Sequence, residues 1–600
     1  MEYKPNISLL LIGVLYLIFT AYWLQYASEP NSDGAAYLDM ARNIILRGVF
    51  RSNMRFSWND YANIQWQLGG DYFTHPFGIY NIALFFLIGD ISLLSAQLCS
   101  IFTGFLMIMT LYAMLERMFD RRVAFLAIVL ACIHPEIPAH ITLVGVVEVT
   151  GALYLLLSMY LTSRLVFDTP GPSEDRKIWF STLAGFSMFA MFYSWYFNLF
   201  IYLSILPITI LLMSITKIRF LFVNFFIISF LILFFIFDWR FLSLYSILYL
   251  RFPLIFSLLV YALTILIYRK LWKKHNYYVI ELLIFIIPLI VHLSVFNNHP
   301  LMLEFNSQQS IVTSNVEKMK KIIFSRIYNP NYIQVYWEMY ITGVRKYLGD
   351  AILILSLLAL FQVHKARKVV FLSLYPLLYV FFWLFYVEID AFQPRFIFAF
   401  SLFCFALSAI NLVSLLDNIL SYITHASCFM IDIRIKVRNK TIKLIKVTPA
   451  FLISFISLLS FLLVLTTIFI HPLYADYRQV LYSWQYKRIF NWEPAIQWIK
   501  TNTSPDEVFL TRSANYLSWY CDRIMVFLPP YTNITFNDVI DIAKKYNVSY
   551  FFVDLRTYWL YPNLRQFYKQ SMPLPLNVTF ISIINDTKVI IYDLRQYAKN

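Results

Sequence analysis

The segment that decides the fold runs from residue 91 to residue 122 and reads ISLLSAQLCS IFTGFLMIMT LYAMLERMFD RR. Its apolar part, Ile91–Met118, is longer than the roughly 20 residues that a helix needs to cross a hydrocarbon core. Arginines stand at its end, at Arg117, Arg121 and Arg122. Because Lys and Arg collect in cytoplasmic loops, this segment predicts a transmembrane helix that ends on the inner side of a membrane.

The composition indicates a lipid environment for most of the chain. Hydrophobic residues make up 60% of the 600 residues, charged residues make up 14%, and the mean hydropathy is +0.63. A soluble protein of this size could not cover so much apolar surface with so few charges. The net charge of +15 does not indicate a nucleic-acid partner, because Lys and Arg fall mostly in short clusters between apolar runs. The five scattered cysteines predict neither a disulfide framework nor a cysteine-based zinc site.

Further apolar runs predict an α-helical polytopic membrane protein with about thirteen spans. No small-residue cleavage site follows the first run, Ile7–Tyr26, so we expect a retained helix with a cytoplasmic N-terminus. The loops at residues 27–77 and 297–349 then lie outside, and Ile79–Gly89 is expected to form a helix that lies on the membrane surface or is half-buried in it. The other predicted spans are Ile91–Met118, Val123–Ile133, Val147–Leu165, Ile178–Trp195, Phe197–Ile215, Phe220–Phe237, Phe241–Tyr268, Tyr278–Phe296, Ala351–Val363, Val369–Tyr386, Phe396–Leu416 and Pro449–Ile470.

These patterns divide the chain into a multi-span domain, residues 1–470, and a small extracytoplasmic α/β domain, residues 471–600. In the second part, short β-branched and aromatic runs alternate with helical patterns. Asn533 or Thr535 is expected to cap one helix. The predicted strands are Val508–Thr511, Ile524–Leu528, Tyr550–Val553, Phe580–Ile584 and Lys588–Tyr592, and the predicted helices are Ser513–Tyr520 and Phe536–Tyr546.

Five N-x-Ser/Thr sequons in the C-terminal part, at Asn502, Asn533, Asn547, Asn577 and Asn585, agree with an extracytoplasmic location. The alternative is that a composition rich in Asn and Thr produces them by chance. The C-terminal part contains no glycine-rich loop that would cradle phosphate, so we expect the chemistry elsewhere.

Four ionisable residues are candidates for chemistry at the outer membrane face. Asp33 begins a short helix in the loop NSDGAAYLDMARNI, residues 31–44, and His75 stands before a helix start, where anions bind well. Glu148 is an isolated acid in an apolar run, and Arg395 lies at the outer mouth of a span. Three of them have a structural alternative: a helix cap for Asp33, an internal ion pair for Glu148, and interfacial snorkelling for Arg395.

At these residues the sequence resembles the GT-C class of membrane glycosyltransferases, and in particular the branch of protein O-mannosyltransferases and lipid A aminoarabinose transferase. The resemblance follows the order of features along almost the whole chain. The chain departs from its relatives at three places. Relatives often carry a second acid where this chain has Gly34 and a second proline where it has Phe77. They also often carry an Arg near the turn between the fifth and sixth spans, where this chain has Ser194–Tyr196. The oligosaccharyltransferase-type motif Trp-Trp-Asp-Tyr-Gly is absent, which disfavours transfer of a whole glycan to Asn. The matching features are Asp33–Arg42, His75-Pro76, Glu116–Arg122, Glu148 and Arg395-Phe396.

The resemblance implies transfer of a sugar from a polyprenyl- or dolichyl-phosphate donor to a glycan, lipid or protein acceptor. Asp33 would be the general base of an inverting displacement, and Glu148 would orient the acceptor or tune Asp33. Arg395 and His75 would bind the donor phosphate. Tyr37 and Arg42 would contact substrate. No cofactor is required, although two acids and a histidine are compatible with a divalent metal.

The sequence leaves two other functions open. A transporter or flippase of a lipid-linked sugar would use the same outward cavity, but the sequence contains no convincing internal repeat. A receptor or scaffold that binds through its C-terminal part is the third hypothesis. Formation of a new glycosidic bond separates the enzyme from both.

Overall fold

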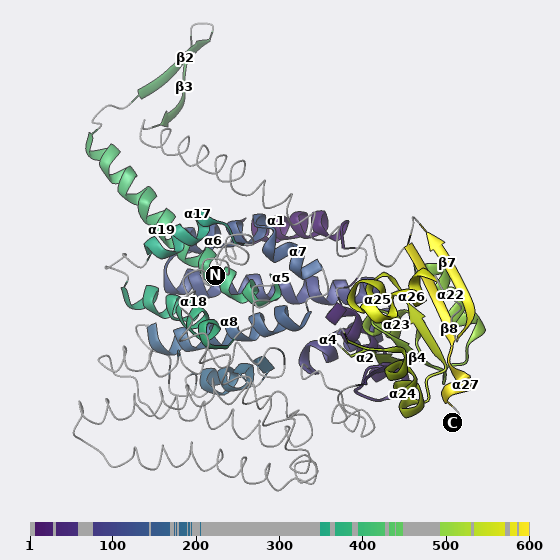
Figure 1. Cartoon of the computed structure of the whole chain (residues 1–600). Coiled ribbons are helices and arrows are strands. Elements are labelled where there is room, and N and C mark those ends of the chain that lie inside the picture. The colour runs from purple at the N-terminus through teal and green to yellow at the C-terminus, as the bar shows by residue number, and fades with distance from the viewer. Residues whose placement is uncertain are drawn as a thin grey trace, which may run out of the picture.

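The computed structural model shows helices in the N-terminal and central parts of the chain and an α/β unit near the C-terminus (Figure 1). Five predicted spans lie outside the described residues, so the count of about thirteen spans stays a prediction. They are Phe197–Ile215 (apart from Ile205), Phe220–Phe237, Phe241–Tyr268, Tyr278–Phe296 and Pro449–Ile470. The described residues are 7–27, 30, 32–57, 76–142, 146–167, 348–359, 366–386, 394–426, 431–437, 440–447, 492–529, 533–570, 576–584 and 587–598, with a few positions between 173 and 205.

Three helices in the described part of the chain are long and apolar enough to cross a membrane. They are α5 (Leu93–Met118), α8 (Val146–Phe167) and residues Phe398–Asn418 of α19 (Pro394–Ala426). Each coincides with a predicted span, because a long apolar run specifies a spanning helix without help from the rest of the chain. The polytopic membrane architecture is therefore confirmed.

A bent pair of helices forms a fourth span if both cross as one. The helix α6 (Arg121–Ile133) meets α7 (Glu136–Thr142) at an angle of 57°. His134 between them is extended, with ψ of 129°, because the following Pro135 disfavours the helical conformation of the residue before it. The predicted span Val123–Ile133 ends at this bend.

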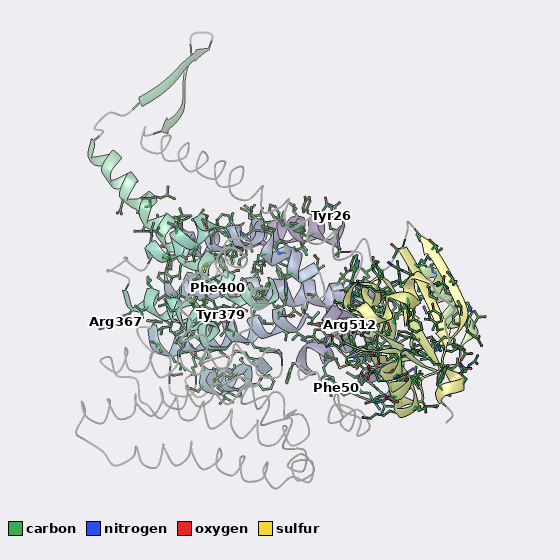
Figure 2. The ribbon with its side chains drawn as sticks, in the orientation of Figure 1. Tyr26, Phe50, Arg367, Tyr379, Phe400 and Arg512 are labelled. Atoms are coloured by element: carbon green, nitrogen blue, oxygen red, sulfur yellow. The ribbon has the colours of Figure 1, made fainter. Side chains whose placement is uncertain are left out.

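The helices pack closely around one another in the membrane part. Gly104 of α5 allows this, because a Cβ there would lie 2.6 Å from Tyr16 Oη and 2.7 Å from Ile141 Cδ1. Tyr379 and Phe400, both labelled in Figure 2, pack with ring centroids 5.2 Å apart. The remaining described helices of this part are α1 (Ile7–Leu24), α2 (Ser32–Arg47), α4 (Pro76–Ile88), α17 (Asp350–Leu358) and α18 (Ala366–Tyr386).

The C-terminal unit is built around a six-stranded sheet in the order β1-β5-β4-β6-β8-β7. The strands β1, β5, β4 and β6 are parallel, and β8 and β7 are antiparallel to their neighbours. Helices cover both faces, so the central strands are buried on both sides, as parallel strands require. The strands are β1 (Met54–Phe56), β4 (Val508–Thr511), β5 (Ile524–Phe527), β6 (Tyr550–Val553), β7 (Asn577–Ile584) and β8 (Thr587–Asp593). The helices are α22 (Glu493–Asn502), α23 (Ala514–Cys521), α24 (Phe536–Tyr546), α25 (Leu555–Leu560), the 3₁₀ helix η8 (Pro562–Leu564), α26 (Arg565–Lys569) and α27 (Arg595–Ala598).

The edge strand β1 comes from the loop at residues 27–77 and was not predicted. It pairs with β5 in parallel, and Met54 lies opposite Met525. Three residues are too few for a periodic signal, and the strand forms where it pairs with β5. The loop after the first span is therefore joined to the C-terminal unit through the sheet.

A second unpredicted feature follows α19. The basic segment between the last two predicted spans forms an antiparallel hairpin of β2 (Ile431–Val437) and β3 (Lys440–Val447). In Figure 1 the hairpin stands clear of the labelled helices. Alternation of apolar and charged residues in these strands was the available signal, but the basic residues were interpreted only as an inner loop.

Candidate active site

The helix that carries Asp33 is packed between two parts of the molecule. On α2, Ala35 and Ala36 belong to the core beneath the C-terminal sheet, with Phe509 and Met525. The next residues of α2, from Tyr37 onward, belong to a separate core formed with α4 and the start of α8. Both surroundings are needed to set the position of α2.

Asp33 itself lies in the first turn of α2 and is partly exposed. A negative charge at this place is stabilised by the free N–H groups and the dipole of the helix. Tyr37 lies one turn further on and is buried, with 3% of its surface exposed. Asp33 is therefore partly accessible to solvent, whereas Tyr37 belongs to the core.

Glu148 lies in the first turn of α8 and is buried, with 4% of its surface exposed. The start of α4 approaches this turn closely. A Cβ on Gly78 would lie 2.8 Å from Val147 Cγ2 and 3.0 Å from Val147 Cα, so only glycine fits without a shift. Since Val147 and Tyr37 share one core, the first turns of α4 and α8 and the middle of α2 converge.

Arg395 is the second residue of α19, and α19 packs against α7 and α8. One turn later on α19, the Phe398 ring lies 4.8 Å from the His140 ring of α7. His75 lies outside the described residues. The Phe398–His140 contact thus places the start of α19, which carries Arg395, beside α7, and the start of α8, which carries Glu148, shares a core with α2 and α4.

Buried polar residues gather on the bend between α6 and α7. The Glu136 N–H donates to His134 Nδ1 (3.3 Å), so His134 Nε2 is the protonated nitrogen and donates to the Leu348 carbonyl oxygen (3.1 Å). Among the described residues, no hydrogen-bond partner reaches the Glu136 carboxylate or His140 Nε2, and both side chains are buried. Unpaired polar groups in such a place are costly.

Arg42 makes its contacts with the C-terminal unit. Its guanidinium donates to the carbonyl oxygens of Trp519 (2.7 Å) and Ser518 (3.0 Å), pairs with Asp39, and lies 5.3 Å from the centre of the Trp519 ring. It also lies 2.9 Å from Asp522 Oδ1. With 7% of its surface exposed, Arg42 is a buried link between α2 and α23.

Other contacts complete this junction. Asn53 N donates to Asp39 Oδ2 (2.5 Å), which folds the loop after α2 back onto the helix. Phe50, labelled in Figure 2, packs against Tyr80 of α4 with ring centroids 5.4 Å apart. Burial raises the pKa of the neighbouring Cys521 thiol to about 12, so that thiol stays neutral. No local sequence signal indicated this junction.

Within the described part of the chain, no group of three or more His, Cys, Asp or Glu residues is arranged to hold a metal ion. The described acids Asp33 and Glu148 therefore do not form a metal centre with other described donors.

The chain has the fold of the GT-C class of membrane glycosyltransferases, as comparison with solved structures shows. Archaeal oligosaccharyltransferase AglB from Archaeoglobus fulgidus, in complex with an inhibitory peptide and a dolichol-phosphate, aligns with a TM-score of 0.58 at 14% identity, covering 100% of this chain and 78% of that chain. The Archaeoglobus fulgidus oligosaccharyltransferase in complex with Zn and sulfate aligns with a TM-score of 0.54 at 12% identity, covering 94% of this chain and 71% of that chain. ArnT from Cupriavidus metallidurans in the apo state has a TM-score of 0.49 at 12% identity and 98% coverage of both chains.

No protein-family model and no curated protein sequence matches this chain. The two oligosaccharyltransferase structures, at 14% and 12% identity, establish a shared fold and not a shared substrate. The resemblance to the GT-C class, drawn from the order of sequence motifs, is confirmed.

Proposed function

We propose that this protein is a glycosyltransferase that moves one sugar from a polyprenyl- or dolichyl-phosphate donor to an acceptor at the outer membrane face. The observation that carries the proposal is the position of Asp33, an accessible acid in the first turn of a helix held within a GT-C fold. AglB, which shares that fold, was solved with a dolichol-phosphate, and a lipid phosphate of this kind suits a site between membrane helices. The acceptor is a glycan, lipid or protein hydroxyl.

The proposed chemistry is an inverting displacement. Asp33 takes the proton of the acceptor hydroxyl while that oxygen forms a bond to the anomeric carbon. The bond from the anomeric carbon to the phosphate oxygen breaks, and the lipid phosphate leaves with the negative charge. Arg395 and His75 stabilise that charge, because a cation beside the leaving oxygen is favoured most when the charge has developed.

Glu148 and the two other residues predicted for the site are given supporting roles. Glu148 orients the acceptor or tunes Asp33 from the start of α8. Tyr37 and Arg42 were expected to contact substrate. Because Tyr37 is buried and Arg42 is engaged by the C-terminal unit, we propose that both act by positioning α2.

The proposed orientation places the N-terminus in the cytoplasm and residues 471–600 outside, as the distribution of basic clusters suggests. A divalent metal accompanies the Archaeoglobus fulgidus oligosaccharyltransferase in one structure, which holds Zn and sulfate. The proposal for this chain requires no metal.

The function is tested by following release of free lipid phosphate and formation of the glycosylated acceptor by the purified protein, with polyprenyl- and dolichyl-phosphate sugars as donors. Asp33→Asn keeps the size of the side chain but removes the base, and we expect a loss of roughly 10² to 10⁴ in rate. The matched control is Asp506→Asn, an exposed acid of the C-terminal unit, which should keep full activity. Near-full activity of Asp33→Asn would refute the role of Asp33. Movement of the lipid across the bilayer without a new glycosidic bond would instead identify a transporter.

A further inference from the structure

The strongest unassigned group of polar contacts lies where α2 meets the end of α23. Arg47 Nη2 donates to both carboxylate oxygens of Asp522, at 2.9 Å and 3.0 Å. Arg42 Nη2 lies 2.9 Å from Asp522 Oδ1, and Asn53 Nδ2 donates to the same oxygen at 3.0 Å. One carboxylate of the C-terminal unit therefore receives two guanidinium groups and an amide from the loop after the first span.

The local structure of Asp522 disfavours an aspartate. It ends α23 in the left-handed conformation, with φ of 53° and ψ of 44°, where glycine has the lowest cost. Its negative charge also lies at the C-terminal end of a helix, where the dipole favours a cation. The left-handed backbone and the helix dipole thus both disfavour Asp522, and its contacts with Arg42 and Arg47 offset these two costs.

The contacts extend from Asp522 into the body of α2. Arg42 also pairs with Asp39, whose other oxygen accepts the N–H of Asn53. Trp519, whose carbonyl oxygen and ring both contact Arg42, stacks on Phe86 of α4 at 6.1 Å. The network therefore reaches α2, α4 and the C-terminal unit. A single half-exposed ion pair contributes little, but a partly buried network of this kind restricts several elements at once.

We propose that Asp522 is a positioning residue that locks the helix carrying Asp33 to the C-terminal unit. The C-terminal unit then contributes to catalysis through this contact, because Asp522 sets where Asp33 lies relative to Glu148 and the start of α19. The catalytic consequence rests on the proposed function, whereas the restraint on α2 does not.

The decisive variant is Asp522→Gly. Because glycine suits the left-handed conformation, the C-terminal unit should stay folded and its amides in α23 and β5 should keep their protection from hydrogen exchange. The amides of α2 should exchange faster, on the order of tenfold, because their anchor is lost. In the transfer assay kcat should fall about tenfold or more with the donor KM unchanged, since misplacing a base slows the chemical step without weakening donor binding.

The matched control is Gln570→Gly, a second left-handed residue of the C-terminal unit, at the end of α26. It should leave both exchange of α2 and kcat unchanged. Asp522→Glu, which keeps the charge, should restore part of the lost kcat.

The two proposals fail in different ways. Unchanged exchange of α2 in Asp522→Gly would overturn the positioning role, whatever the activity. Faster exchange with unchanged kcat would also overturn it, provided that Asp33→Asn is inactive, and would leave the proposed function intact. Absence of transfer by the wild-type protein with every donor would contradict the proposed function, while the exchange measurement would still decide the restraint.

Discussion

Thr535 illustrates how one residue organises the C-terminal unit. It caps α24: its hydroxyl accepts the N–H of Asp538 (3.4 Å), and the Asp538 carboxylate accepts the N–H of Thr535 (2.7 Å). This reciprocal arrangement satisfies two backbone donors that the helix itself cannot. The backbone N–H of Thr535, followed by its hydroxyl, lowers the pKa of Asp538. The sequence left Asn533 and Thr535 open as caps, and the structure selects Thr535.

Thr535→Ala should destabilise α24 by about 1 kcal/mol, because it removes the cap. The measurement is the free energy of opening of the α24 amides from hydrogen exchange in the full-length protein. Thr535→Ser keeps a capping hydroxyl and the sequon, and should cost little. Asn533→Gln removes the sequon alone, so an equal loss in that variant would mean that a glycan, and not the cap, is responsible.

The same capping box predicts a pH dependence. Since the pKa of Asp538 is lower in the folded state, its contribution to stability is present above the unfolded value, near 3.8, and is lost as pH falls through the folded value. Protection of the α24 amides in the wild type should therefore fall below about pH 4, and Asp538→Asn should lack this component. An identical pH profile in that variant would contradict this assignment.

At the scale of elements, the close approach of α4 and α8 sets the geometry of the candidate site. Gly78 contacts Val147, the residue before Glu148, and the start of α8 shares a core with Tyr37 of α2. Close-packed interiors transmit a change of even one methyl group. A shift of α4 should therefore displace the first turn of α8 and with it Glu148.

Gly78→Ala should push α4 and α8 apart and destabilise the protein by roughly 1–3 kcal/mol, because the new methyl group would meet the Val147 backbone. We expect a lower temperature of thermal inactivation and slower sugar transfer. The matched control is Gly13→Ala in α1, where the nearest atom, Phe105 Cε2, would lie at an ordinary 3.9 Å. Equal behaviour of the two variants would show that the α4–α8 contact does not constrain the site.

At the scale of the whole molecule, the helices and the α/β unit are joined by the loop after the first span. That loop supplies α2, which packs beneath the sheet, and β1, which extends the sheet. In Figure 1 the α/β unit lies at one end of the helical part. The connection between α5 and α6 lies a full span, about 39 Å of helix, beyond the start of α5.

This arrangement predicts that Lys544, exposed on α24, and Arg121, at the start of α6, lie on opposite sides of the membrane. In intact cells a membrane-impermeant maleimide should label Lys544→Cys, and it should label Arg121→Cys only after permeabilisation. The four cysteines in the described residues, Cys99, Cys132, Cys404 and Cys521, are buried and should give little background. Labelling of Arg121→Cys alone in intact cells would reverse the proposed orientation, and labelling of both would contradict the assignment of α5 as a span.

The spans α5, α8 and α19, the strands β4 to β8 and the helices α23 and α24 were predictable because apolar runs and periodic patterns act locally. Thr535 as a cap, β4 over Val508–Thr511 and α24 over Phe536–Tyr546 are all properties of a few consecutive residues. The place of Asp33 at the start of a helix could be predicted for the same reason, and its role stays a prediction. The hairpin of β2 and β3 also had a local signal, in its alternating residues.

Only the tertiary structure decided which distant residues meet. The pairing of β1 with β5 and the contacts of Arg47 with Asp522 join positions about 475 residues apart. In neither case does the sequence around one partner indicate the other. The αL conformation of Asp522 would by itself favour glycine, so its charge makes sense only once Arg42 and Arg47 are beside it. Such contacts depend on how whole elements pack, which is a property of the folded chain and not of any single segment.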